Sequence, residues 1–260
     1  MLCLLTVAQD HVGTVVISAS EDKIVIGADS KVTPTGLGSE GKETGLKCKI
    51  STLNGKFVFA AVGRSGHESD GHPELSWDSF PLADEIAQKN TSASLETVAQ
   101  AWGHAVAALH TRDAERRVIS TEFAEESDIE IALFAGFVGG KPAVYQVPIS
   151  KQAFFRSFKY IPTVLQVELK PEAVYPSGAE DIAIEWLAGQ TDRAKLWQSE
   201  FGKLHPRPWN WDSVMVPLIE SITDLTIKYS IKKETVGPPI ELVEISGSGI
   251  KWLKNERQCQ

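Results

Sequence analysis

Cysteine is scarce in this chain of 260 residues, which contains only Cys3, Cys48 and Cys259. Three cysteines so far apart are too few for the disulfide framework of a small secreted domain, or for a cysteine-based zinc site. The low count is consistent with a reducing compartment. We expect no bound metal and no cofactor.

The chain also lacks long apolar runs and has fewer basic than acidic residues. No run approaches the ~20 apolar residues that a membrane-spanning helix needs. Lysine and arginine total 26 against 34 aspartates and glutamates, which gives a net charge of −8. A general nucleic-acid binder needs a basic face, so this balance argues against one. We expect neither a membrane nor a nucleic acid as a partner.

The N-terminus contains no basic residue before Lys23, although Met1–Ala8 is apolar. A secretory signal peptide begins with a basic segment. We therefore interpret residues 1–13 as a leader or propeptide and expect the protein in the cytoplasm. A truncated signal peptide stays open as the alternative, and it would make the protein secreted or periplasmic.

The composition is that of a globular domain, with 42% hydrophobic and 23% charged residues. Short runs rich in β-branched or aromatic residues, bounded by turn residues, predict strands. These runs occupy residues 14–19, 23–28, 57–62, 129–135, 143–147, 153–158, 163–169, 240–245 and 249–253. Hairpin turns are predicted at Asn54-Gly55 and Gly139-Gly140. Polar, glycine-rich composition predicts loops over 33–46 and 63–81.

Apolar residues at steps of three and four predict a helix over residues 95–109, with Ser94 as its N-cap. Further helices are predicted near 179–188 and 213–230. The helices come in blocks and do not alternate with single strands, so the predicted fold class is α+β. Neither a low-complexity linker nor an internal repeat divides the chain. We therefore predict a single domain over residues 14–260.

The N-terminal quarter of the chain combines four features whose order and spacing are characteristic. They are a Gly-Thr pair that opens a strand, a strand that ends in Ala-Asp-Ser, a Lys-Ile pair after a loop, and a strand that ends in Gly. In this sequence they are Gly13-Thr14, Ala28-Asp29-Ser30, Lys49-Ile50 and Gly63. With this pattern the chain resembles the proteasome-subunit family of N-terminal-nucleophile (Ntn) hydrolases. The separation of Lys49 and Gly63 in the sequence is also that of the family.

Two later features agree with the resemblance, which extends over most of the chain. Ser177-Gly178 precedes a predicted helix, and Glu241 begins an acidic-apolar strand near the C-terminus. The resemblance implies a four-layer αββα sandwich in which the strands at 14–19, 23–28 and 57–62 neighbour one another in one sheet. It also implies a peptide or unfolded polypeptide as substrate, and a homo-oligomer that forms a ring.

The family's chemistry is that of a threonine-type amide hydrolase, and it requires Thr14 to become the first residue. A threonine hydroxyl needs a base, and a free α-amine with a pKa near 7.7–8.0 suits that task. By resemblance Lys49 stabilises the alkoxide, Asp29 holds Lys49, and the Gly63 N–H faces the oxyanion. Ser177 completes the expected catalytic set. In this scheme the bond between Gly13 and Thr14 is cleaved by the chain itself.

One spacing leaves a second interpretation open. Thr14 lies one position closer to Asp29 in the sequence than the family's nucleophile does. An ungapped match therefore places Gly13 at the nucleophile position, and a shorter hairpin would restore Thr14 to it. Because strand side chains alternate between faces, a slip of one residue would turn Thr14 away from Lys49. The alternative function is a non-catalytic proteasome-like subunit with a scaffold or interaction role.

Overall fold

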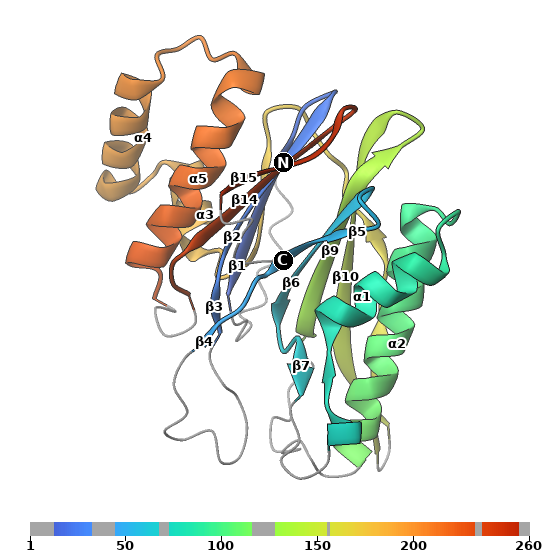
Figure 1. The fold of residues 1–260 in the computed structure, drawn as a ribbon. Coiled ribbons are helices and arrows are strands. Elements are labelled where there is room, and N and C mark those ends of the chain that lie inside the picture. The colour runs from blue at the N-terminus through green and yellow to red at the C-terminus, as the bar shows by residue number, and fades with distance from the viewer. Residues whose placement is uncertain are drawn as a thin grey trace.

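The computed structural model describes residues 13–32, 45–67, 73–115, 128–154, 157–231 and 236–254. Within these ranges the chain forms two main antiparallel sheets and five α-helices, so the predicted α+β class is confirmed. Figure 1 shows the two sheets lying between two groups of helices. Residues 1–12 of the leader expected at 1–13, and most of the loop expected at 33–46, lie outside the described residues.

The first main sheet has the order β13-β1-β2-β14-β15. Its strands span Val174–Gly178, Thr14–Ala19, Lys23–Asp29, Ile240–Ser246 and Gly249–Lys254. The runs TVVISA and KIVIGAD are rich in β-branched residues, and the polar turn between them closes with a bond from Ser20 N–H to the Lys23 carbonyl. Strands β1 and β2 form one hairpin, and β14 and β15 form another.

The second main sheet has the order β11-β10-β9-β6-β5, and the short β12 also pairs with β10. These strands span Ser157–Pro162, Lys141–Phe154, Asp128–Val138, Phe57–Gly63, Ile50–Leu53 and Leu165–Gln166. Asn54 and Gly55 have φ values of 52° and 61°, the left-handed pair that a tight hairpin turn requires. Both predicted hairpin turns are confirmed.

The expectation that residues 57–62 share a sheet with residues 14–19 and 23–28 is wrong. Strand β6 pairs with β5 and β9 in the second sheet, whereas β1 and β2 lie in the first. The run FVFAAVG is buried along most of its length. An apolar run of this kind fits either sheet, because its local pattern carries no information about its distant partners.

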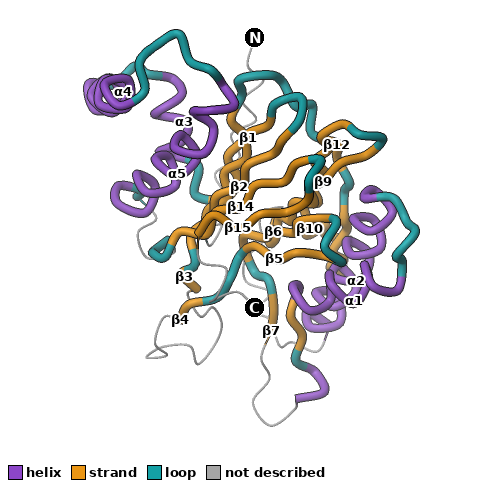
Figure 2. Tube along the Cα trace, turned by 45° about the horizontal axis from the view of Figure 1, so that its top comes forward, coloured by secondary structure: helices purple, strands orange, loops and turns teal. Residues whose placement is uncertain are grey.

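The helices cover the outer faces of the two sheets (Figure 2). Helix α5 packs on the first sheet, α3 packs against α5 and α4 against α3, whereas α1 and α2 pack on the second sheet. A separate core cluster, which includes Val15, Ile26 and Val243, fills the space between the sheets. The helices span Ser79–Lys89, Leu95–Glu115, Asp181–Ala188, Asp192–Leu204 and Trp211–Tyr229, from α1 to α5.

Three of these helices match predictions, whereas α1 and α4 were not predicted. The segment 63–81 was expected to be a loop, but its described part contains short strands and the start of α1. These strands are β7 at Gly66–His67 and β8 at Trp77–Asp78, with a 3₁₀ turn at Pro73–Leu75 between them. Two more short strands, β3 at Lys31–Val32 and β4 at Gly45–Leu46, pair with each other. None of the described helices is long and apolar enough to span a membrane.

Candidate active site

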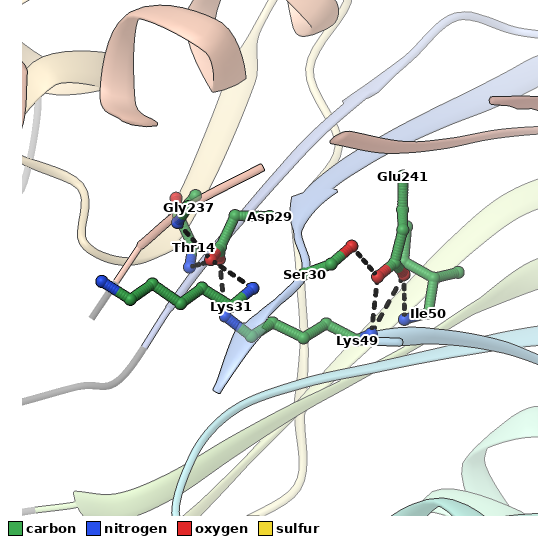
Figure 3. A network of polar contacts seen from close by, with 8 residues as sticks. All are labelled: Thr14, Asp29, Ser30, Lys31, Lys49, Ile50, Gly237 and Glu241. Atoms are coloured by element: carbon green, nitrogen blue, oxygen red, sulfur yellow. Dashed lines mark hydrogen bonds and ion pairs between the residues drawn. The ribbon is translucent and has the colours of Figure 1, made fainter. Parts of the chain in front are cut away.

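Asp29 organises the candidate site at the end of β2, where it is fully buried. One carboxylate oxygen, Oδ1, accepts hydrogen bonds from the Thr14 N–H at 2.8 Å and from Lys49 Nζ at 2.7 Å. The other, Oδ2, accepts from the N–H groups of Gly237 at 3.0 Å and Lys31 at 3.2 Å. Figure 3 shows these donors converging on the carboxylate. The predicted contact between Asp29 and Lys49 is confirmed.

Lys49 lies just before β5 and is 5% exposed. Burial lowers the pKa of its ammonium group, and the charge of Asp29 and the hydrogen bond to it oppose that shift. A buried cation without a partner would be costly, so the ion pair with Asp29 is what permits Lys49 at this depth. The pair joins the first sheet to the segment that enters the second.

A second buried carboxylate, Glu241 of β14, also joins the two sheets. It accepts hydrogen bonds from Ser30 Oγ at 2.6 Å, from the Lys49 N–H at 3.0 Å and from the Ile50 N–H at 2.8 Å. Burial raises the pKa of Glu241 to about 7, although these hydrogen bonds act to lower it. Sequence reasoning noted Glu241 only as part of a strand pattern. Its signal is an acidic residue next to the apolar Leu242 and Val243 in a largely buried strand, where a carboxylate requires buried partners.

Gly13, and not Thr14, faces Lys49. A Cβ atom built on Gly13 would lie 2.2 Å from Lys49 Nζ and 3.1 Å from Asp29 Oδ1. Lys49 therefore occupies the space into which a side chain at position 13 would project. The φ of Gly13 is +97°, in the left-handed region that favours glycine.

Thr14 begins β1 and contributes its backbone to the site. Val15 packs between the sheets, whereas Val16 packs with the residues of α5. Because side chains alternate along a strand, Thr14 lies on the same face as Val16, away from Lys49. Its Oγ1 is buried and has no hydrogen-bond partner among the described residues. The structure thus brings Thr14 N–H, Asp29 and Lys49 together without the Thr14 hydroxyl.

Ser177 and Gly178 lie beside the first strand at the end of β13. Ser177 pairs with Val15 and Gly178 pairs with Thr14. The Gly13 carbonyl packs against Gly178 and accepts a hydrogen bond from the Ala179 N–H at 2.8 Å. The Ser177 hydroxyl is buried and has no hydrogen-bond partner in the described part of the chain.

Gly63 ends β6 opposite Glu130 of β9. Its φ is +96°, and a Cβ atom there would lie 2.4 Å from the Ile129 carbonyl oxygen. A side chain would therefore collide with the neighbouring strand, which gives this glycine a packing role. The contacts around its Cβ position come from β9 and not from Gly13 or Lys49.

Cys48, directly before Lys49, is disulfide-bonded. A single disulfide needs only two of the three cysteines, so this bond is compatible with the prediction that the chain lacks a disulfide framework. Their wide spacing in sequence gave no indication of it. Cys3 and Cys259 lie outside the described residues.

No group of three potential metal ligands occurs within the ranges that the structure describes. The polar groups around Asp29 are already engaged with one another, and their donors are amides, a hydroxyl and an ammonium group. Such a set holds carboxylates in place.

No protein-family model matches the chain, and no curated protein matches it either.

Proposed function

We propose that the chain is a proteasome-like Ntn domain, a four-layer αββα sandwich, with a non-catalytic role as a scaffold or interaction subunit. The observation that carries this proposal is the position of Gly13 against Lys49. In the ungapped match to the family, position 13 is the nucleophile position. A glycine there has no hydroxyl to activate, so the Asp29–Lys49 pair is left with a structural task.

The hydrogen bonds around Asp29 support that structural role. Asp29 accepts from the Thr14 N–H and the Gly237 N–H, which fixes the first strand and the segment before β14 at one point. While Gly13 precedes it, the Thr14 nitrogen belongs to a peptide bond and cannot act as a base. Lys49 then serves to neutralise Asp29 within the core.

The second candidate is the threonine-type amide hydrolase, acting on a peptide or an unfolded polypeptide. Two observations favour it. The Gly13 carbonyl accepts a hydrogen bond from the Ala179 N–H, which would polarise it toward attack. The Thr14 hydroxyl is buried without a partner among the described residues, and it belongs to the residue that follows this carbonyl. Attack by Oγ1 on the Gly13 carbonyl carbon and hydrolysis of the resulting ester would release residues 1–13.

Intact-mass spectrometry of the purified recombinant protein separates the two functions. The non-catalytic proposal expects the bond between Gly13 and Thr14 to stay intact after long incubation. It also expects wild type and Thr14→Ala to retain the same N-terminal residues. A mass that lacks residues 1–13 in the wild type but not in Thr14→Ala would overturn it. In that case Lys49→Ala should slow the cleavage, because the variant lacks the cation that stabilises the alkoxide.

The disulfide at Cys48 favours the alternative compartment that the sequence left open. Stable disulfides form mainly in oxidising environments such as the periplasm or the extracellular space. We propose that the protein is secreted or periplasmic. Thiol labelling of protein purified without reductant tests this, since labelling of all three cysteines would contradict it.

A further inference from the structure

A second set of buried polar groups lies beneath helices α1 and α2, away from the Asp29 site. Ser79 begins α1, His110 lies near the end of α2, and Glu130 belongs to β9. All three are completely buried. Glu130 lies on the helix-facing side of its strand, since Ala132 and Phe134 pack in the same core as α2.

The carboxyl group of Glu130 connects the two helices to the sheet. Its Oε1 lies 2.6 Å from Ser79 Oγ, and its Oε2 lies 3.2 Å from His110 Nε2. The backbone of Ser79 extends the connection, because its N–H donates to the Ser65 carbonyl and its own carbonyl accepts from Trp102 Nε1. One carboxyl group therefore contacts one residue of each helix.

No lysine or arginine of the described chain lies within ion-pair distance of Glu130. The charges of Lys47 and Asp78 act on Glu130, but these two residues pair with each other before α1. The other ionisable groups that face this region from the packed elements are Arg64 after β6, Asp113 on α2 and Tyr160 on β11. An ionised Glu130 would thus be a buried charge without a direct cationic partner, which is costly.

The hydrogen bonds of Glu130 can form while it carries a proton. His110 Nδ1 has no partner among the described residues, so a proton on that atom would be a buried donor left unpaired. The proton of a neutral His110 therefore belongs on Nε2, where it is donated to Glu130 Oε2. Ser79 Oγ donates to an ionised Oε1 across the 2.6 Å contact, and a protonated Oε1 can donate to Ser79 Oγ across the same contact. The absence of a direct cationic partner is what favours the neutral acid.

We propose that the folded protein holds Glu130 as a neutral carboxylic acid, and that Ser79, Glu130 and His110 form a proton-dependent lock between helices α1 and α2 and the sheet. We call these three residues the buried lock. Loss of the Glu130 proton to solvent leaves a carboxylate in the core and weakens the attachment of both helices. The proposal is independent of whether the Gly13 site is catalytic.

Burial raises the pKa of Glu130 from 4.5 to about 8, and burial lowers the pKa of His110 from 6.5 to about 3. The raised pKa of Glu130 gives stability that is present below pH 4.5 and lost as the pH rises toward 8. The lowered pKa of His110 has the opposite effect, because stability is lost as the pH falls from 6.5 toward 3. Between pH 6.5 and 8, Glu130 is therefore the member of the lock that governs stability.

The test is urea unfolding of the full chain at a series of pH values from 6.5 to 8.5. We expect the folding equilibrium constant of the wild type to fall by up to about tenfold per pH unit from Glu130. Glu130→Gln mimics the neutral acid, so it should remove that share of the decline and be at least as stable as the wild type at pH 8.5. Glu96→Gln, on the exposed surface of α2, is the matched control and should leave the decline unchanged.

Two results would overturn the proposal. One is a pH dependence in Glu130→Gln as steep as in the wild type, and the other is a Glu130→Gln variant that is less stable at every pH. If this variant does not fold, carboxyl ¹³C NMR of the wild type decides the question. The lock requires a glutamate that titrates near pH 8 together with changes in the resonances of a neutral histidine. Titration of every glutamate below pH 6 would exclude it.

Discussion

Lys49 shows at the scale of a single residue how a buried cation can hold a buried carboxylate in place. Its ammonium group lies 2.7 Å from a carboxylate oxygen that also accepts the first strand's N–H. The same Asp29 carboxylate accepts from Gly237, which precedes β14. Without the cation, Asp29 would be an uncompensated charge at the point where these segments meet.

We predict that Lys49→Met lowers the free energy of unfolding by about 3–5 kcal/mol, because it leaves Asp29 buried and unpaired. Lys89→Met is the control, since Lys89 forms an exposed ion pair with Glu85 one helical turn away. Lys89→Met should lower the free energy of unfolding by less than about 1 kcal/mol. Urea denaturation at pH 7 measures both values. Adding Asp29→Asn to Lys49→Met should recover part of the loss, and equal losses in the two lysine variants would contradict the structural role of the pair.

At the scale of an element, helix α4 shows that a side-chain N-cap and a short apolar stripe are enough to define a helix in the folded protein. Its buried residues, Ala194, Trp197 and Phe201, follow steps of three and four. Thr191 is the N-cap, and its hydroxyl accepts the Ala194 N–H at 3.0 Å. The signal was present in the sequence but is diluted by charged residues. Helix α1 has the same kind of stripe, and its N-cap is Asp78, whose side chain accepts the Phe80 N–H.

Thr191→Ala should destabilise the protein by about 1 kcal/mol, because the Ala194 N–H loses its acceptor at the start of α4. The hydroxyl also donates to Glu185 of α3, so the variant loosens the contact between the two helices. Thr163→Ala is the control, since Thr163 is exposed outside the helices and its replacement should change stability by less than about 0.5 kcal/mol. Thermal or urea unfolding checks both. An equal response of the two variants would show that the cap contributes nothing.

At the scale of the whole molecule, the two sheets leave several edges without a partner strand in the described chain. The edges of the first sheet are β13 and β15, and those of the second are β11 and β5. Exposed strand edges are sites where another chain can pair. Large apolar side chains are also exposed on the helical side, with Leu204 at 78%. These features suit a protein that functions in contact with copies of itself.

We predict a homo-oligomer, in keeping with the scaffold role and with the ring expected from the family resemblance. Light scattering coupled to size-exclusion chromatography at micromolar concentration measures the mass directly. The expected mass is a multiple of 28.4 kDa, the mass of one chain. A single species with the mass of one chain across the concentration series would reject the prediction, and dissociation on dilution would give the strength of the contact.

Much of the local structure could be predicted from the sequence, because turn residues and the alternation of side chains along a strand act over a few neighbouring residues. The hairpin turn at Asn54-Gly55 and the hairpin of β1 and β2 follow directly from such signals. The proximity of Asp29 and Lys49 came from the spacing shared with a family. Glu241 was noted as a strand residue, but its hydrogen bonds to Ser30 and Ile50 were not foreseen.

The contacts between distant segments, and the face of the strand on which each residue lies, follow only from the tertiary structure. Strand β6 could have joined either sheet, since burial on both faces removes the pattern that would identify its neighbours. Gly13 and Thr14 differ by one position, yet only the three-dimensional register places Gly13 against Lys49. Ser79 and Glu130 are far apart in the sequence, and no local pattern relates them. They are in contact because the packing of α1 on the second sheet places both polar groups in the same buried space, where each is the other's hydrogen-bond partner.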